Sequence, residues 1–456
     1  MANNSPHQTH YTRQTQSLLA KVYGRSPLKD SLLEQAISYF SQENLRSSDE
    51  KISTTEAQLL QLQRAERCAY LLSISLTIFE LAEGGGLTEN NRKSARFLGT
   101  IQLLSTTEGK QVAESNERSK SVYKAVLCLR LLDDLIINGL MNESYIKKFL
   151  VDISPEQYIN FSSHDHEAYL RFSEQVKIPL IMAALLQDIG NYHPRAQRIL
   201  CGEDNKLNPY RTLDTEQRKK LLRIDYSQTI KYLNDGIGMP DFVGNTKADR
   251  EQFLLDEQGK LTFINQLLKQ SVNPKKTIGN LLKVPQIYTS IILSTKPNYK
   301  YKVLPQVFQV LNRSAELGIC EQAVVDALYK VTGMFPQGYG VVYVPSGEFS
   351  DVGDCYEYAI VNSLYPKHAQ HPHCRMTTRK LTYMGYGQNI ILLKNQNLYF
   401  SQTANKLARL SKERLHEILS LLSSNAHERQ QLDLLPRCWH ANEFFSLKAH
   451  QNLWNN

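Results

Sequence analysis

The most informative stretch of this 456-residue chain is Ile178–Tyr192, IPLIMAALLQDIGNY. Its residues up to Leu186 are apolar and predict a buried helix. A membrane span is excluded, because a bilayer requires roughly 18 apolar residues and this run is shorter. The apolar run ends in a polar pair, Gln187 and Asp188, followed by Ile-Gly. An Asp at the end of a buried helix is more often a cap or a paired core carboxylate than a ligand.

The chain on both sides of this stretch has a mostly helical pattern. Ser31 opens one amphipathic segment with a capping-box spacing, and Ala57–Ala82 and Ser119–Asn138 predict long helices. The glycines at 84–86 follow no strand pattern and precede no Lys-Ser/Thr pair, so they favour a helix stop over a phosphate loop. A helical pattern with irregular breaks continues from about residue 167 to 331.

Beyond Phe335 the pattern changes to short β-type runs that are separated by turn residues. These runs are Val341–Val344, Tyr356–Val361, Arg379–Met384 and Asn389–Leu393. A helical pattern returns at Leu407–Leu422. The fold class that we expect is therefore mainly α, with a small antiparallel β element near the C-terminal end.

Composition limits the class of protein. The chain has 53 Lys and Arg against 45 Asp and Glu, a formal charge of +8, and 41% apolar residues, which excludes a wholly disordered chain. We expect neither a membrane span nor a signal peptide, and the seven scattered cysteines favour a reducing compartment, so we expect a cytoplasmic protein. The basic clusters at 218–223 and 296–302 favour solvated helix faces over nucleic-acid binding, although a small anionic ligand is compatible with them.

In this helical context, Ile178–Tyr192 resembles AALLHDIGK, the signature of the HD superfamily of metal-dependent phosphohydrolases. Further on, Asp235–Pro240, DGIGMP, looks like the DGxGYP element of the HD-GYP group. Three later segments are similar in order and spacing: Val284–Ile291 to VADVYDAL, Lys296–Tyr299 to Arg-Pro-Tyr, and Met334–Glu348 to the C-terminal YPxG…LSNGE extension. The resemblance covers roughly residues 167–366.

The resemblance implies a helical phosphodiesterase that hydrolyses cyclic di-GMP with two or three metal ions, bridged by the HD aspartate. This sequence has Gln187 for the His, Asn191 for the Lys of HDIGK, Ile230-Lys231-Tyr232 for His-His-Glu, and Gln286 for the Asp of VADVYDAL. Asp188 alone remains of the ligands, and one carboxylate cannot hold two ions about 3.5–4 Å apart. The sequence therefore predicts a domain without catalysis or cofactor. The alternative, an active phosphodiesterase with rearranged ligands, would use divalent Fe or Mn.

The remnant of the site comprises Gln187, Asp188, Asn191, Lys231, Tyr232, Asp235, Gly236, Gly238, Met239, Pro240 and Gln286. We expect Asp188 to be paired with backbone N–H groups or with a cation such as Arg195 or Lys231. Lys231, with Arg223 and the N–H groups of the loop glycines, would then face an anion without any metal. The alternative is a cleft that is filled by Tyr232 and Met239.

Other His and Cys residues are weaker candidates for metal ligation or catalysis. His164–Glu167 could supply an early HD ligand, but a loop that caps the next helix explains it better. His193 precedes a proline in a loop, and His368–Cys374 lacks a standard zinc spacing and predicts a polar hairpin loop. Cys355 has no activating base in sequence reach.

We expect five segments along the chain: a disordered arm at 1–20, an N-terminal helical region at 21–160, a degenerate HD-GYP-like helical domain at 161–332, a small β element at 333–402, and a C-terminal helix and tail at 403–456. The expected function is that of a bacterial signalling protein. It would act through a protein partner of its pathway or as a sensor of a nucleotide, such as a cyclic dinucleotide. A purely structural helical scaffold is a third alternative, and formation of a homodimer stays open.

Overall fold

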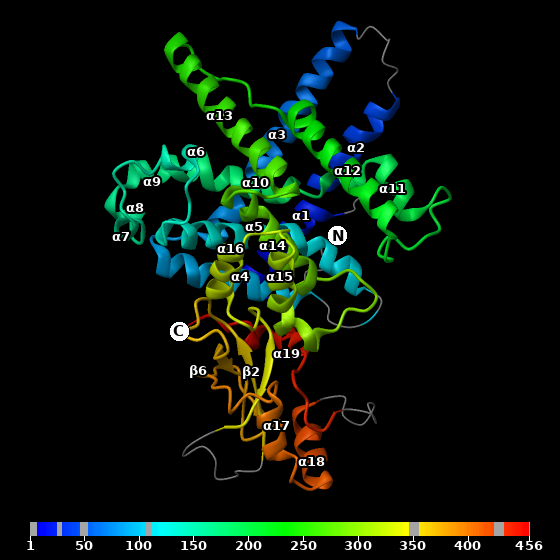
Figure 1. Ribbon diagram of the computed structural model, residues 1–456, viewed down its shortest axis with the longest axis vertical. Helices are drawn as coiled ribbons and strands as arrows, with labels where there is room; N and C mark the ends of the chain where they lie inside the picture. The colour runs from blue at the N-terminus through cyan, green and yellow to red at the C-terminus, as the bar shows by residue number, and fades with distance from the viewer. Residues whose placement is uncertain are drawn as a thin grey trace.

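The computed structural model describes residues 7–24, 30–45, 53–105, 109, 111–345, 355–423 and 433–455. Helices make up most of it, and a small antiparallel sheet lies toward the end of the molecule that holds the C-terminal part of the chain (Figure 1). The prediction of a mainly α fold with a small antiparallel β element is confirmed. Residues 1–6 of the predicted arm and residues 346–348 of the predicted extension lie outside the described residues.

Helix α5 forms the centre of the helical part. The N-terminal helices are α1 (His10–Tyr23), α2 (Leu32–Leu45), α3 (Thr54–Ala82), α4 (Leu87–Leu104) and α5 (Val112–Ile137). Every residue of α5 from Ser121 to Leu135 is buried, including the charged Lys124, Arg130 and Asp133. A helix without an exposed face must be enclosed by other elements, and α1 and α4 cover part of it.

The prediction of a disordered arm was wrong for the part of it that the structure describes, because this part contains α1. Thr9 caps the helix by accepting a hydrogen bond from the N–H of Thr12, and Leu18, Leu19 and Val22 are buried. The segment is polar on average, but its few apolar residues lie on one face of the helix, and this face packs against α5.

Other predicted features of the N-terminal helices are confirmed. Ser31 Oγ accepts a hydrogen bond from the N–H of Glu34 at 3.2 Å, as the capping box predicts. Helix α3 ends at Ala82, directly before the glycines at 84–86. Among the described residues no single helix is both long and apolar enough to cross a bilayer; α3 and α4, which are bent by 111° at their junction, meet that test only as a pair.

The middle of the chain completes the enclosure of α5. Its helical elements are α6 (Ser144–Lys147), α7 (Pro155–Tyr158), α8 (Phe161–His164), α9 (His166–Phe172), η1 (Ser173–Lys177), α10 (Ile178–Leu186), η2 (Ile189–Tyr192), α11 (Pro194–Cys201), α12 (Thr215–Lys231), η3 (Tyr232–Ile237), α13 (Lys247–Val272), α14 (Thr277–Ile292), η4 (Tyr301–Gln306), α15 (Val307–Glu316) and α16 (Gln322–Thr332). Of these, η1 and η3 are π-helical, a form that often accompanies functional sites. Helices α10, α14 and α16 pack against α5, so the two helical segments predicted as separate units share one core.

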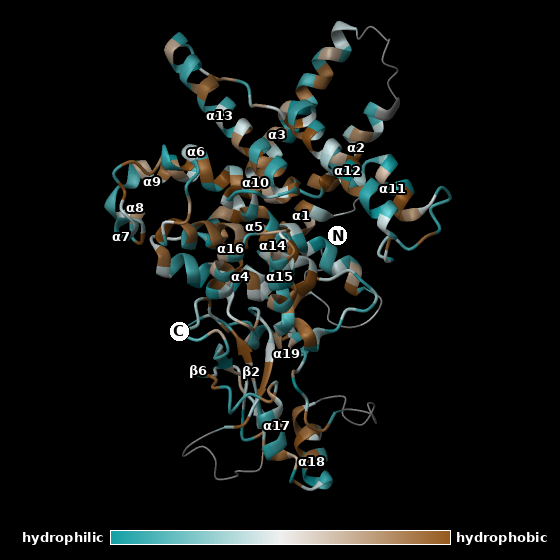
Figure 2. Cartoon of the chain, viewed as in Figure 1, coloured by the Kyte–Doolittle hydropathy of each residue, from teal (hydrophilic) through white to brown (hydrophobic). Residues whose placement is uncertain are grey.

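The sheet follows α16. Its strands are β1 (Gly340–Tyr343), β2 (Glu357–Val361), β3 (His373–Met376) and β6 (Asn389–Ile391), paired antiparallel in the order β1-β2-β3-β6, and β4 (Thr378–Arg379) pairs with β5 (Thr382–Tyr383). Strands β1 and β2 are buried along their whole length, and brown, hydrophobic residues are visible in β2 in Figure 2. The expected hairpin loop over His368–Cys374 is partly wrong, because its last two residues begin β3.

The C-terminal segment returns to the helical part. Its helices are α17 (Ser401–Leu407), α18 (Lys412–Leu422), α19 (Asn442–Ser446) and η5 (Lys448–His450). The helix predicted over 407–422 therefore corresponds to α18, which begins later than predicted, and α17 was not predicted. Trp439 stacks on Tyr358 of β2 with ring centroids 4.5 Å apart. Gln451 Oε1 accepts hydrogen bonds from Thr9 N at 2.8 Å and from Thr12 Oγ1 at 2.7 Å. The C-terminal tail therefore holds the N-terminal helix in place.

Gly99 of α4 allows the tail to dock, and Gly99→Ala is expected to destabilise the protein. An added Cβ would lie 2.2 Å from the ring of Trp454. Overpacking of this kind costs about 1–3 kcal/mol, which exceeds the roughly 1 kcal/mol that Ala contributes as a helix former. Chemical denaturation measures the effect. Gly85→Ala is the control, because a Cβ there has its nearest neighbour at 3.6 Å, and equal stability of the two variants would contradict the prediction.

Candidate functional site

Asp188 lies where the buried helix α10 gives way to the turn η2. The apolar residues of α10 fill the core and so fix the point at which the chain becomes polar. Gly190 is required in the turn, because a Cβ there would lie 2.1 Å from the carbonyl oxygen of Asp225 in α12. The N–H of Gly190 donates to Thr229 Oγ1 at 3.0 Å, which holds the turn against α12.

Both carboxylate oxygens of Asp188 accept hydrogen bonds from nitrogen donors. Lys124 Nζ on α5 lies 2.8 Å from Oδ2, and Gln286 Nε2 on α14 lies 2.8 Å from Oδ1. The side chain of Lys124 is 3% exposed and that of Asp188 is 42% exposed, so solvent reaches the carboxylate but hardly the ammonium. Burial opposes ionisation of Asp188, but the Lys124 charge and the two hydrogen bonds outweigh it and hold the pKa of Asp188 below its usual value.

The prediction that a cation compensates Asp188 is confirmed, but the choice of cation was wrong. The cation at Asp188 is Lys124, and Lys231 instead forms an ion pair with Glu43 of α2. Lys124 was missed because it lies 64 residues before Asp188. The available signal was a lysine inside the otherwise apolar run Val122–Leu129, since a buried charge has to be paired.

A second carboxyl group lies behind Asp188. Asp225 of α12 is 7% exposed, and its Oδ1 has no hydrogen-bond partner in the described part of the chain. Burial raises the pKa of Asp225 well above its usual value, and the nearby charge of Asp188 raises it further. The surroundings therefore act in opposite directions on the two carboxyl groups: they favour the charged form of Asp188 and the neutral form of Asp225.

Further cations surround this pair. Lys120 Nζ on α5 lies 3.1 Å from Glu117 Oε2 and 3.4 Å from Thr295 Oγ1. Burial lowers the pKa of Lys283 on α14, and the charge of Arg218 adds to this effect. Burial, followed by the charges of Lys120 and Arg218, likewise lowers the pKa of Lys296. These lysines therefore form one electropositive cluster.

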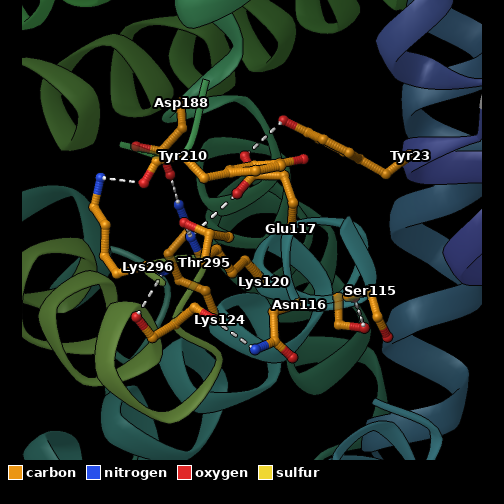
Figure 3. Close-up of polar contacts among 12 residues, drawn as sticks. Tyr23, Ser115, Asn116, Glu117, Lys120, Lys124, Asp188, Tyr210, Thr295 and Lys296 are labelled. Atoms are coloured by element: carbon orange, nitrogen blue, oxygen red, sulfur yellow. Dashed lines mark hydrogen bonds and ion pairs between the residues drawn. The ribbon is translucent and has the colours of Figure 1, made fainter. Parts of the chain in front are cut away.

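A cavity of about 720 Å³ opens beside the cluster. Figure 3 shows Lys124 directed toward Asp188, with Glu117, Lys120 and Lys296 among the neighbouring polar side chains. The cavity wall carries four tyrosines: Tyr23 of α1, Tyr192 of η2, Tyr210 of the loop before α12, and Tyr299 of the loop after α14. The hydroxyls of Tyr23 and Tyr192 lie 3.5 and 3.4 Å from Glu117 Oε1, and their rings meet edge to face at 5.4 Å.

The residues around Asp188 do not fit a divalent metal ion. The two carboxylate oxygens accept hydrogen bonds from the Lys124 ammonium and from the Gln286 side-chain N–H₂ group. Neither nitrogen has a lone pair that could bind a metal ion. An ammonium 2.8 Å from the carboxylate would repel a second cation at the same oxygen. Within the described residues no group of three or more His, Cys, Asp and Glu side chains is arranged to hold a metal ion.

The structure brings together only Asp188 and Gln286 among the predicted site residues. Gln187 is buried and donates to Ser271 Oγ at 3.2 Å, and the carbonyl of Asn191 accepts from Gln197. Tyr232 is fully buried against Tyr39 and Phe40 of α2. Of the two residues expected to fill the cleft in the alternative, Tyr232 is part of the core, whereas Met239 lines two cavities.

The DGIGMP segment faces α3. Arg67 Nε donates to the carbonyl of Gly236 at 2.7 Å, and Arg64 Nη2 donates to that of Asn234 at 3.1 Å. Gly238 has a φ of +65°, and a Cβ there would collide with the Arg64 guanidinium. Asp235 is exposed, whereas Met239 and Pro240 line two other cavities. The first part of the segment therefore belongs to the π-helix η3, and the predicted turn is limited to Gly238, whose N–H donates to the carbonyl of Leu233 at 2.8 Å.

The weaker candidates have structural roles. Asp165 caps α9 by accepting a hydrogen bond from the N–H of Ala168 at 2.9 Å, as the loop explanation predicts. His193 caps α11 through its Nδ1, and burial together with Arg195 lowers the pKa of its imidazole. Cys374 is fully buried in β3, and burial raises its pKa well above the usual value.

Sequence reasoning missed a second, fully buried charge cluster. Lys177 Nζ lies 2.7 Å from Glu83 Oε2 and 3.3 Å from Asp133 Oδ1. Arg130 also pairs with Glu83 and lies 2.8 Å from Asp133 Oδ2, while Tyr158 Oη donates to Asp133 Oδ1 at 2.8 Å. All four charged side chains are at most 2% exposed. The cluster therefore links α3, α5, η1 and α7 as a structural element rather than as an open site.

Comparison of the chain with protein-family models, with curated proteins and with solved structures finds no match.

Proposed function

We propose that this protein is a signalling protein whose HD-GYP-like domain binds an anionic ligand, such as a cyclic dinucleotide, without metal and without hydrolysing it. The observation that carries the proposal is the pairing of Asp188 with Lys124 and Gln286. In an HD-type enzyme, a metal ion at this aspartate activates the attacking water. Here an ammonium takes up the carboxylate charge, and it supplies neither a Lewis acid nor a bound hydroxide.

The charge around Asp188 supports an anionic ligand. Five basic groups, Lys120, Lys124, Lys283, Lys296 and Arg218, lie around the carboxyl groups of Asp188, Asp225 and Glu117, and burial favours the neutral form of Asp225. Phosphate oxygens would satisfy the exposed lysine donors and relieve the repulsion between them. Because Lys124 pairs with Asp188 and Lys120 pairs with Glu117, the exposed Lys296 and Arg218 are the cations that a ligand would meet first.

The aromatic wall of the cavity supports a ligand that carries a ring. Tyr23, Tyr192, Tyr210 and Tyr299 offer ring faces or edges beside the lysines. Stacking of a nucleobase on an aromatic side chain contributes about 1–3 kcal/mol per base. A phosphate next to one or two bases therefore matches the chemistry of the cavity, and we propose that a protein partner of the pathway reads the bound state.

The purified protein is expected not to hydrolyse cyclic di-GMP or its linear dinucleotide product, even with Mn²⁺ or Fe²⁺ added. The physical reason is that the remaining carboxylate is held by Lys124 and Gln286 and cannot bridge two ions. Chromatography of the nucleotides after incubation measures this. Metal-dependent turnover that is lost in Asp188→Ala would instead establish the active phosphodiesterase.

Binding of cyclic di-GMP is expected to persist in the presence of EDTA and to weaken with added salt. Lys296→Gln and Arg218→Gln each remove one outer charge and should weaken binding roughly fivefold, the equivalent of about 1 kcal/mol. Lys231→Gln is the matched control, because Lys231 belongs to the same helical part but pairs with Glu43 on another face. Titration calorimetry that finds no heat at any salt concentration, or equal losses in all three variants, would contradict nucleotide sensing.

A further inference from the structure

A separate cavity of about 540 Å³ lies between α3, α10 and α13. In Figure 1 the outer ends of α3 and α13 diverge as two arms, and α10 lies where they converge. The loop at 237–243, which includes the last four residues of the DGIGMP segment, completes the cavity wall. The volume lies within the roughly 300–1,000 Å³ that is usual for small-molecule sites.

The cavity wall is mostly apolar and partly exposed. Leu72 and Leu76 of α3 are 37% and 39% exposed, and Met182 of α10 is half-buried. Phe242 of the loop and Phe253 of α13 contact one another with ring centroids 5.5 Å apart. An apolar ligand would remove these side chains from water, which is favourable in proportion to the area covered.

The charges in the wall are predominantly acidic. Glu174, Asp241 and Glu257 line the cavity together with one cation, Lys260. Lys260 Nζ lies 2.7 Å from Glu174 Oε1 and 2.6 Å from Glu257 Oε1, so one ammonium is shared by two carboxylates. The Glu174 side chain remains 62% exposed and can meet a ligand from solvent. The excess of carboxylates favours a cationic group at this end and opposes an anionic one.

The wall is formed before any ligand arrives. The loop is fixed to α3, because Arg64 and Arg67 donate to the carbonyls of Asn234 and Gly236. Gly238 turns the chain with a φ of +65° directly against Arg64. A ligand would therefore not have to order this loop, and the free-energy cost of binding is reduced accordingly.

We propose that this cavity binds a small amphiphile with an apolar body and a cationic head, such as a hydrophobic amine. The body would lie among Leu72, Met182 and Phe242, and the head would lie beside the exposed carboxylate of Glu174. The enclosed volume suits a small molecule, and the acidic wall selects the sign of its head. This site is independent of the ligand proposed for the Asp188 cluster.

Three probes that share a ten-carbon chain test the proposal: decyltrimethylammonium, decanol and decanoate, each titrated below the concentration at which it forms micelles. Calorimetry on the full chain should find decyltrimethylammonium the tightest, with decanoate weaker by roughly fivefold or more. Equal binding of all three, tighter binding of decanoate, or binding of none would overturn the proposal.

Variants assign the binding to this cavity. Met182→Trp and Leu76→Trp fill the space from two different helices and should each weaken binding of decyltrimethylammonium about tenfold. Glu174→Gln should weaken the ammonium probe but not decanol. Glu316→Gln is the control, because Glu316 is also 60% exposed and also has one ion-pair partner. Unchanged affinity for decyltrimethylammonium in both Trp variants would overturn the proposal. A change of oligomeric state without any probe binding would also overturn it, because the cavity would then lie in a contact between protein chains.

Discussion

Arg130→Met is expected to lower the free energy of unfolding by about 3–5 kcal/mol, the usual cost of breaking a buried ion pair from one side. Burial opposes the charge of Arg130, but Asp133 and Glu83 outweigh it and raise the pKa of the guanidinium. Without Arg130, two buried carboxylates would share the single ammonium of Lys177. Because α3, α5, η1 and α7 meet at this cluster, the loss should affect the whole helical part. Denaturation by urea, followed by far-UV circular dichroism, measures it.

Charge balance distinguishes this explanation from a loss of packing alone. The double variant Arg130→Met/Asp133→Asn restores neutrality and should be more stable than Arg130→Met, although it removes one further interaction. Arg313→Met is the surface control, because the pair with Glu316 is 69% and 60% exposed and contributes about 0–1 kcal/mol. If the losses of unfolding free energy caused by Arg130→Met and by Asp133→Asn simply added in the double variant, the charge argument would fail.

The fold could be predicted from sequence wherever a local pattern determines the element. The long helices α3 and α5 carry uninterrupted helical patterns, and the glycines at 84–86 mark the end of α3. Strand β3 carries no such pattern, because its residues become a strand by pairing with β2 on one side and β6 on the other. Helix α1 was missed since its order depends on the distant contact of Thr9 and Thr12 with Gln451.

The candidate site could be predicted only in part. The end of an apolar helix identifies Asp188 as a carboxylate that must be compensated, and the VADVYDAL resemblance selects Gln286, which does contact it. Neither pattern identifies Lys124, because the contact depends on how α5 packs against α10. Lys231 was chosen from its closeness to the DGIGMP motif, but its position on α12 directs it to Glu43. Which face of a helix meets a neighbour is decided by tertiary packing.

Asp225 gives the strongest expected dependence of stability on pH. Its pKa in the folded protein is raised, first by burial and then by Asp188, with Lys124 and the Asn191 amide acting in the opposite direction. In the unfolded chain an Asp titrates near a pKa of about 3.9. Between these two pKa values the folded state holds a proton that the unfolded state has released. Folding stability therefore falls with rising pH by about 1.4 kcal/mol for each pH unit in that window.

Asp225→Asn removes this titration and is expected to raise the free energy of unfolding at pH 7 relative to the unmodified chain. The advantage should shrink as the pH is lowered and should vanish below about pH 3, where Asp225 is protonated in both states. Asp188→Asn should act in the opposite direction, because the lowered pKa of Asp188 contributes stability above pH 4 that is lost as the pH falls. Urea denaturation of the three proteins from about pH 2.5 to pH 8 measures both effects, because the contribution of Asp188 is lost only below the unfolded pKa of about 3.9. Parallel curves for Asp225→Asn and the unmodified chain would show that Asp225 is ionised in the fold, and the cluster beside the cavity would then carry one positive charge less.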